Sequence, residues 1–179
     1  ILPNGNILIV AWERLYSSDW QDLGRTSVNN SLNQMWGEAI FEVEPNLETG
    51  AANIVWEWHI TDHLVQDLDT QYLSTYGEIS DHPELMDVNC GSVGSNGGPG
   101  GSANGDWMHI NAIDYNADLD QIVFSSRHQD EIFVIDHSTT TAEAASHSGG
   151  NAGMGGDFLY RWGNPQNYDR GTDQDKILG

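Results

Sequence analysis

The residues best suited to chemistry lie in two short segments of the chain. The segment 106–111 contains His109 and Asn111, and Arg127 follows about twenty residues later. On a β-strand, residues two apart point to the same face, so His109 and Asn111 should project together. Arg127 joins them if 121–127 forms the neighbouring strand. Such a group can hold a tetrahedral anionic ester, because arginine offers a planar fork of donors and a protonated histidine and an amide add more.

The same side chains also have a purely structural interpretation. A buried histidine and asparagine commonly satisfy loop carbonyl groups. Arg127 could pair with one of many acidic side chains, because the chain has 27 acidic and 6 basic residues. The residue types alone therefore leave an anion site and a structural cluster as alternatives.

Two further patterns resemble metal sites but lack part of the ligand set. His59 and His63 have the spacing of a helical zinc site, but the glutamate of that motif is absent and the segment follows a strand. The run 114–120 alternates oxygen-bearing side chains like a calcium loop, yet lacks the sixth-position glycine and the distal glutamate. A hairpin turn explains this run more simply, although calcium binding there stays open. We expect neither a metal site nor a cofactor.

Short apolar runs bounded by turn residues must position these side chains. They predict strands rather than long helices, because the runs are short and the turns contain Asn, Gly, Pro and Asp. Short helical turns are expected only inside connections, at 62–69, 83–87 and 140–145. The predicted strands are 7–12, 39–43, 53–58, 121–126, 131–136 and 158–162.

Two of the predicted hairpins resemble each other. The run 40–44 aligns with 132–136, and the run 54–58 aligns with 158–162. Repeated antiparallel units with an aromatic-rich last strand are typical of β-propeller blades. We therefore expect an all-β fold with about two antiparallel blades of a β-propeller, and a β-sandwich is the alternative.

Two blades do not close a ring, since propellers have roughly four to eight. We therefore expect a fragment, or a chain that forms a homo-oligomer to complete the propeller. The whole chain, 1–179, is interpreted as one partial propeller domain. Its parts are a blade at 1–60, a long insertion at 61–106, a blade at 107–163 and a connection towards a missing blade at 164–179.

The long insertion ends in a glycine-rich run over 90–105. This run lacks a lysine and does not lead from a strand into a helix, so a phosphate-binding loop is not expected. The length and composition of the run predict a flexible lid or a surface excursion.

Composition narrows the classes of partner. The formal net charge of -21 repels phosphate backbones, so nucleic acid is not expected as a partner. No run of about 18 apolar residues is present to span a membrane. The single Cys90 cannot form an intrachain disulfide and is expected to be a half-buried thiol. The first ten residues look like a turn and a strand, so they carry no information about a signal peptide.

Several motifs together resemble one known family. Asp-Trp-x-His-x-Asn at 106–111, Ser-Ser-Arg at 125–127 and Tyr-Arg-Trp-Gly at 160–163 are similar to the arylsulfotransferase family of six-bladed β-propellers. The resemblance extends over nearly the whole chain. Further similar segments are Leu2-Pro3-Asn4-Gly5-Asn6, Phe41-Glu42-Val43-Glu44-Pro45, Trp56-Glu57-Trp58 and Asp62-His63-Leu64.

This resemblance implies transfer of a sulfuryl group from a phenolic sulfate ester to a phenol, without a nucleotide sulfate donor. It implies that His109, Asn111 and Arg127 are catalytic residues that bind the sulfate oxygens, and that His63 positions donor or acceptor. It also implies a periplasmic or extracellular location.

In this family a histidine becomes transiently sulfated, within a Gly-Gln-His-Asp-like segment that follows the connection beginning here at Gly163. None of the seven histidines of the chain matches that motif, so the isolated chain is expected to be inactive. A non-catalytic propeller module that binds a ligand or partner, and a hydrolase of sulfate or phosphate esters, are the alternative functions.

Overall fold

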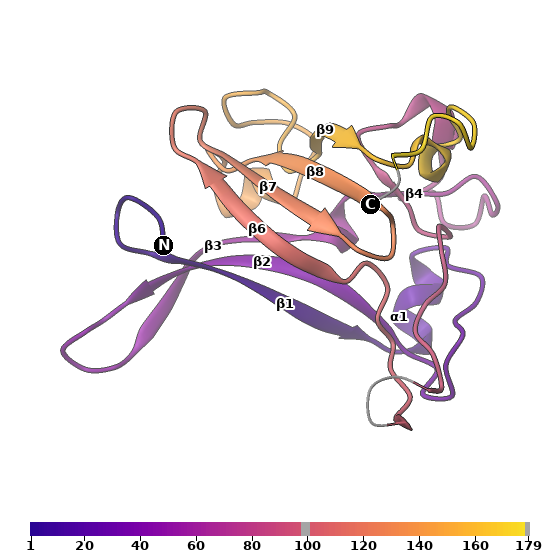
Figure 1. Ribbon diagram of the computed structural model, residues 1–179, viewed down its shortest axis with the longest axis horizontal. Helices are drawn as coiled ribbons and strands as arrows, with labels where there is room; N and C mark the ends of the chain where they lie inside the picture. Colours follow the sequence, from indigo (N-terminus) through magenta and orange to yellow (C-terminus); the bar gives the residue numbers. More distant parts are fainter. Residues whose placement is uncertain (98–100, 178–179) are drawn as a thin grey trace.

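Antiparallel strands make up most of the regular secondary structure in the computed structural model, which describes residues 1–97 and 101–177 (Figure 1). One sheet has the order β1-β2-β3, a second has the order β6-β7-β8-β9, and β4 and β5 form a short parallel pair. The strands are β1 (Ile7–Leu15), β2 (Met35–Pro45), β3 (Ala52–His59), β4 (Leu64–Val65), β5 (Met86–Asp87), β6 (Ile110–Asn116), β7 (Gln121–Ser126), β8 (Glu131–Asp136) and β9 (Phe158–Trp162).

Helix is scarce among the described residues, so the all-β expectation is confirmed. The helices are α1 (Ser17–Asp22) and α2 (Thr141–Ala144), and the 3-10 turns are Ile60–Asp62, Ile79–Asp81 and Pro165–Tyr168. No helix in the described part of the chain is both long and apolar enough to cross a membrane. Neither large sheet closes on itself, so the propeller arrangement stays a prediction.

The predicted bounds of β7, β8 and β9 agree with the structure, whereas β1 and β2 are longer than predicted. β1 continues beyond the predicted end at residue 12 and pairs with β2 as far as Leu15 and Met35. The apolar pattern did not predict this extension, because edge-strand residues can pair without alternating apolar side chains. Two expected helical turns are wrong over most of their length, because 62–69 and 83–87 instead contain the parallel pair β4 and β5. The turn expected at 140–145 is confirmed by α2, which begins at a Thr140 cap.

The internal repeat is confirmed at the level of strand register. Ile40 pairs with Trp58 in the first sheet, and their sequence equivalents Ile132 and Trp162 pair with each other in the second. The following pairs also correspond one to one. Both hairpins contain a bulge at the same place in the repeat, after Glu42 and after its equivalent Val134.

The two sheets pack through opposite faces of this repeat. Trp56 and Trp58 are buried, whereas their equivalents Tyr160 and Trp162 are 57% and 46% exposed. The reverse holds on the other face: Phe124 is buried, whereas its equivalent Ile9 is 43% exposed. The Trp58 ring lies against Phe124, with ring centroids 5.6 Å apart. One continuous core therefore joins the Trp58 face of one sheet to the Phe124 face of the other.

The long connection between β3 and β6 packs closely against the rest of the molecule. Arg25 is buried and donates to the carbonyl oxygens of Val88, Cys90 and Gly91, which anchors the start of the glycine-rich run. Residues 98–100 of that run lie outside the described residues, so the expected lid is untested there. Figure 1 shows this connection and α1 at the right-hand end of the two sheets.

Candidate functional site

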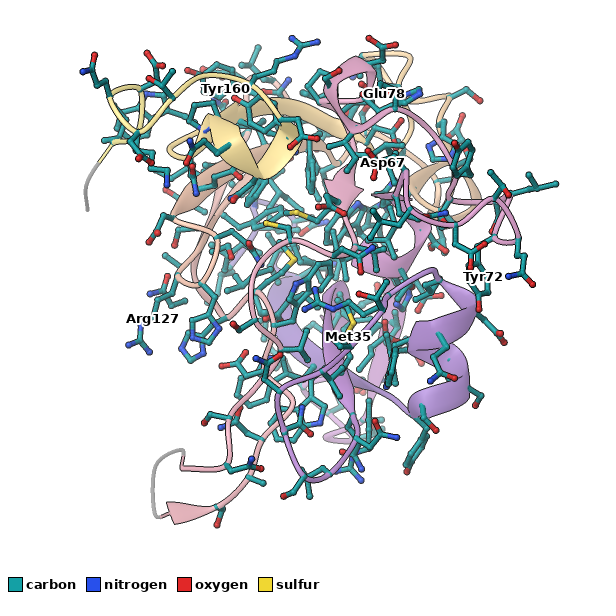
Figure 2. All side chains as sticks on the ribbon, turned by 90° about the vertical axis from the view of Figure 1, so that its right-hand side faces the viewer. Met35, Asp67, Tyr72, Glu78, Arg127 and Tyr160 are labelled. Carbon is teal, nitrogen blue, oxygen red and sulfur yellow. The ribbon has the colours of Figure 1, made fainter. Side chains whose placement is uncertain are left out.

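A surface hollow of about 460 Å³ lies where the segment before β6 meets the β7–β8 turn. Two backbone hydrogen bonds join these segments, from Arg127 N to His109 O and from His128 N to Met108 O, each 3.1 Å long. Figure 2 shows the Arg127 side chain projecting outwards at the left-hand edge of the molecule. The lining residues are Ser92, Gly94, Ser95, Asn104, Asp106, His109, Arg127 and His128.

His109 lines the hollow and has an uncommon backbone conformation. Its φ angle is 56°, in the left-handed region, so the residue precedes β6 and does not follow the alternation of that strand. Its Nδ1 atom lies 2.5 Å from Asp106 Oδ2. The next residue, Ile110, donates its backbone N–H to Glu38 Oε1 at 3.1 Å. These contacts fix both the backbone and the ring of His109.

Asn111 lies on the other side of Arg127. A β-bulge places it between the pairs Ile110–Ser126 and Ala112–Ser125, so it has no partner in the ladder. Its Oδ1 accepts a hydrogen bond of 2.7 Å from Ser125 Oγ. Asn111 and Arg127 line a neighbouring hollow of about 370 Å³ that does not include His109.

The two-residue spacing therefore does not bring His109 and Asn111 together as the sequence predicted. The left-handed residue and the bulge interrupt the regular alternation that this prediction assumed. Arg127 is the residue shared by both hollows. Its side chain is exposed and forms no ion pair within 1–97 and 101–177. The structural alternative, in which Arg127 forms an ion pair with an acidic side chain, is thus not seen in the described residues.

His63 lies inside the core, away from both hollows. Its side chain is fully buried and stacks on Trp58 with an interplanar angle of 3° and a centroid distance of 5.4 Å. Nδ1 contacts Asp157 Oδ1 at 2.8 Å, and Nε2 contacts the Ala144 carbonyl oxygen at 2.8 Å. Because both ring nitrogens are engaged, no atom of His63 is available to a ligand in this structure. Its predicted role in positioning substrate stays a prediction.

Two buried carboxyl groups belong to the His109 site: Asp106 lines the hollow, and Glu38 contacts the backbone of Ile110. Burial raises the pKa of Glu38 to about 7, against the opposing effect of hydrogen bonds from Ile110 N–H and Trp12 Nε1–H. Glu38 Oε2 and Asp106 Oδ1 are buried oxygens without a hydrogen-bond partner. The centroids of the Trp12 and His109 rings lie 6.2 Å apart, with the ring planes tilted by 54°.

Sequence reasoning missed Glu38 and His128 as members of this site. A glutamate between Gly37 and Ala39, in a run that ends in apolar Ile40, was the available signal for a buried carboxyl group. His128 directly follows the Ser-Ser-Arg motif, but its contact with the segment before β6 depends on the turn geometry. Cys90, predicted as a half-buried thiol, is partly buried, and burial raises its pKa to about 12.

Comparison with known proteins gives one match. A family profile described as Arylsulfotransferase (ASST) matches residues 1–143. No curated protein and no solved structure matches the chain. The profile covers both motifs that line the hollow, Asp-Trp-x-His-x-Asn and Ser-Ser-Arg. Because the match spans well over half of the sequence, the chain belongs to the arylsulfotransferase family.

Proposed function

We propose that this chain supplies the anion-binding part of an enzyme that transfers a sulfuryl group from a phenolic sulfate ester to a phenol. The observation that carries the proposal is the common hollow of His109 and Arg127, in which the exposed Arg127 guanidinium forms no ion pair with a described carboxylate. Membership of the arylsulfotransferase family supports the reaction class.

In this proposal the guanidinium of Arg127 binds two sulfate oxygens through its planar fork of donors. An ionised Asp106 accepts the Nδ1–H of His109, which orients the ring and leaves Nε2 for a ligand. Asn111 is the third proposed ligand: its Oδ1 accepts from Ser125, and its Nδ2–H group is the donor that would bind a sulfate oxygen. His63 contributes indirectly, through its packing under Trp58.

The reaction needs two displacements at sulfur. In the first, an attacking histidine nitrogen forms a bond to sulfur while the sulfur–oxygen bond to the first aryl group breaks and the aryl oxide leaves. In the second, the oxygen of the acceptor phenol bonds to sulfur while the nitrogen–sulfur bond breaks and the histidine is released, and the phenolic proton passes to the aryl oxide or to water. Arg127 and His109 would lower both barriers by holding the group and stabilising its negative charge in a preorganised site. None of the seven histidines is assigned the attacking role.

The packing of the repeat supports the finer proposal of propeller blades. In a ring of identical units, each interface joins one face of a unit to the opposite face of the next, as in head-to-tail assemblies. A two-fold sandwich of the same repeat would instead bring equivalent faces together. Here the Trp58 face of the first sheet packs on the Phe124 face of the second sheet. Phe124 is equivalent to Ile9, so this contact joins opposite faces of the repeat. The Trp162 face of the second sheet, which is equivalent to the Trp58 face, is not the one in contact. This arrangement is the one that a propeller requires.

The same correspondence favours further units on both sides of this pair. The exposed Trp162 face repeats the buried Trp58 face, and the exposed Ile9 face repeats the buried Phe124 face. We propose that both exposed faces bind another unit of the same kind, either further blades or a second copy of this chain. A periplasmic or extracellular location and the absence of a cofactor are the remaining parts of the proposal.

Equilibrium binding of 4-nitrophenyl sulfate tests the anion site. We expect Arg127→Lys to weaken binding about tenfold, because a lysine keeps the charge but loses the fork geometry, and tenfold corresponds to about 1.4 kcal/mol. Arg14→Lys, an exposed arginine on β1, is the matched control and should bind like the wild type. Equal affinities for the Arg127→Lys variant and the wild type would reject Arg127 as a sulfate ligand.

A further inference from the structure

Three potential metal ligands meet in the His109 hollow. Asp106, His109 and His128 each offer a carboxylate oxygen or ring nitrogen, and these three atoms lie within 4.8 Å of one another. Asp106 and His109 come from the segment before β6, and His128 comes from the β7–β8 turn. The backbone hydrogen bond from His128 N–H to the Met108 carbonyl oxygen, 3.1 Å long, holds the two segments together. Their sequence separation explains why spacing alone did not predict this cluster.

The cluster contains donor capacity that the described residues leave unused. Asp106 is only 8% exposed, and its Oδ1 atom is buried without a hydrogen-bond partner. A buried carboxylate oxygen in this state is unfavourable unless a proton donor or a cation satisfies it. The exposed His128 ring lies 5.2 Å from the His109 ring and accepts or donates no hydrogen bond within the described ranges. A cation between these groups would satisfy the oxygen and use the nitrogens.

The ligand types indicate the class of ion. Zinc binds histidine nitrogen and carboxylate oxygen at about 2.0–2.2 Å, which places neighbouring donors of a tetrahedral site roughly 3.3–3.5 Å apart. A spacing of this size lies inside the 4.8 Å limit of the cluster, and the exposed His128 side chain on its turn can adjust to it. Imidazole ligands favour zinc and other late transition metals over magnesium or calcium. From this geometry we propose that Asp106, His109 and His128 bind one divalent ion of the zinc class.

Three protein ligands leave a fourth position open, as in catalytic rather than structural zinc sites. The three proposed ligands line the same hollow as Arg127, so a fourth ligand could come from that hollow. A divalent ion would offset the negative charges near the hollow, which otherwise oppose the binding of an anion in a chain with a net charge of -21. The metal site goes beyond the proposed function. Only its extension, in which ion and Arg127 hold one sulfate together, rests on that proposal.

A second cluster with the same ligand types makes a useful comparison. His63, His147 and Asp157 also lie within 4.8 Å of one another. There, however, Asp157 Oδ1 contacts Nδ1 of both histidines, and His63 Nε2 contacts the Ala144 carbonyl oxygen. Both clusters thus contain a histidine–aspartate contact, but no described oxygen of the second cluster is buried without a partner, whereas Asp106 Oδ1 is. The Asp106 cluster is therefore the favoured metal site.

Zinc titration by calorimetry tests the site, in a buffer that does not bind zinc and without aryl sulfate. We expect one saturable zinc ion per chain, and at least tenfold weaker binding for His128→Ala. His147→Ala is the matched control, because it removes an exposed histidine from the second cluster, and its affinity should equal that of the wild type. Since His128 is exposed on a turn, its removal should leave the far-ultraviolet circular dichroism spectrum unchanged.

Asp106→Asn should weaken zinc binding in the same way, and visible absorption of the cobalt(II) form should show the strong bands of a tetrahedral site. Absence of saturable binding, or wild-type affinity in His128→Ala, would overturn the proposal. So would weakening in His147→Ala alone. Arg127→Lys should bind zinc normally, so failure of the sulfate-binding proposal and failure of the metal site give different results.

Discussion

His109 is directed into the hollow by a backbone conformation that most residues avoid. A left-handed conformation costs a non-glycine residue about 1–2 kcal/mol, so it persists only where surrounding contacts hold it. Three contacts hold it here. The His109 ring contacts Asp106, the Ile110 N–H donates to Glu38, and the Arg127 N–H donates to the His109 carbonyl oxygen. The motif identified His109 from sequence, but the direction of its side chain depends on contacts between distant segments.

Glu38 makes stability depend on pH in a direction that can be tested. Its pKa is raised from 4.5 to about 7, so the folded chain binds this proton more tightly than the unfolded chain. Its contribution is therefore fully present below about pH 4.5, declines as pH rises towards 7, and is lost above it. We expect Glu38→Gln to gain about 2 kcal/mol in the free energy of unfolding, relative to wild type, between pH 5 and pH 8.

Urea denaturation of both proteins at several pH values measures this difference. Glu48→Gln, on the exposed turn between β2 and β3, is the control and should differ from wild type by a constant amount. A Glu38→Gln difference that does not change with pH would show that Glu38 titrates normally in the folded protein.

At the scale of elements, one buried ion pair joins β8, β9 and the connection before β5. The Arg161 guanidinium contacts Glu131 through two hydrogen bonds of 2.8 Å and donates to the Leu85 carbonyl oxygen at 2.8 Å. The two side chains are 4% and 0% exposed. We expect Arg161→Met to lower the free energy of unfolding by about 3–5 kcal/mol, because Glu131 is left buried without its counter-charge.

Thermal or urea denaturation can compare this variant with Arg170→Met. The Arg170 side chain is exposed and, among the described residues, donates only to the Ser80 carbonyl oxygen, so its loss should cost less than about 1 kcal/mol. Similar losses in the two variants would mean that the buried pair contributes little to stability.

Strands with alternating apolar residues and clear turn boundaries were predictable from the sequence, as β7, β8 and β9 show. The register of the repeat followed from its alignment. The parallel pair β4–β5 was not predictable, because each strand has two residues and exists only through contact with the other. The same reason applies to the site: the motifs identified His109 and Arg127, whereas the bulge at Asn111 and the positions of Glu38 and His128 depend on contacts across the fold.

At the scale of the whole molecule, each sheet leaves one apolar face exposed, that of Ile9 on the first sheet and that of Trp162 on the second. These faces favour self-association of the chain, whereas its net charge of -21 opposes it. Salt reduces this repulsion, because the screening length is about 10 Å at 0.1 M. We expect the isolated chain to self-associate more strongly as ionic strength rises. Trp162→Glu should reduce that association, whereas Leu47→Glu, on the exposed turn between β2 and β3, should not.

Sedimentation across a salt series measures the association. A monomer at every salt concentration, or equal association of the Trp162→Glu and wild-type chains, would contradict the proposed binding of another unit at the exposed faces.

The position of a bound aryl sulfate tests the central claim most directly. Crystals of the chain soaked with 4-nitrophenyl sulfate, with the sulfur located by its anomalous scattering, would give that position. The account predicts one sulfur atom in the hollow of His109 and Arg127, within roughly 5–6 Å of both side chains, about two hydrogen-bond lengths. Binding at another place on the molecule, or beside Asn111 without contact to His109, would contradict the account.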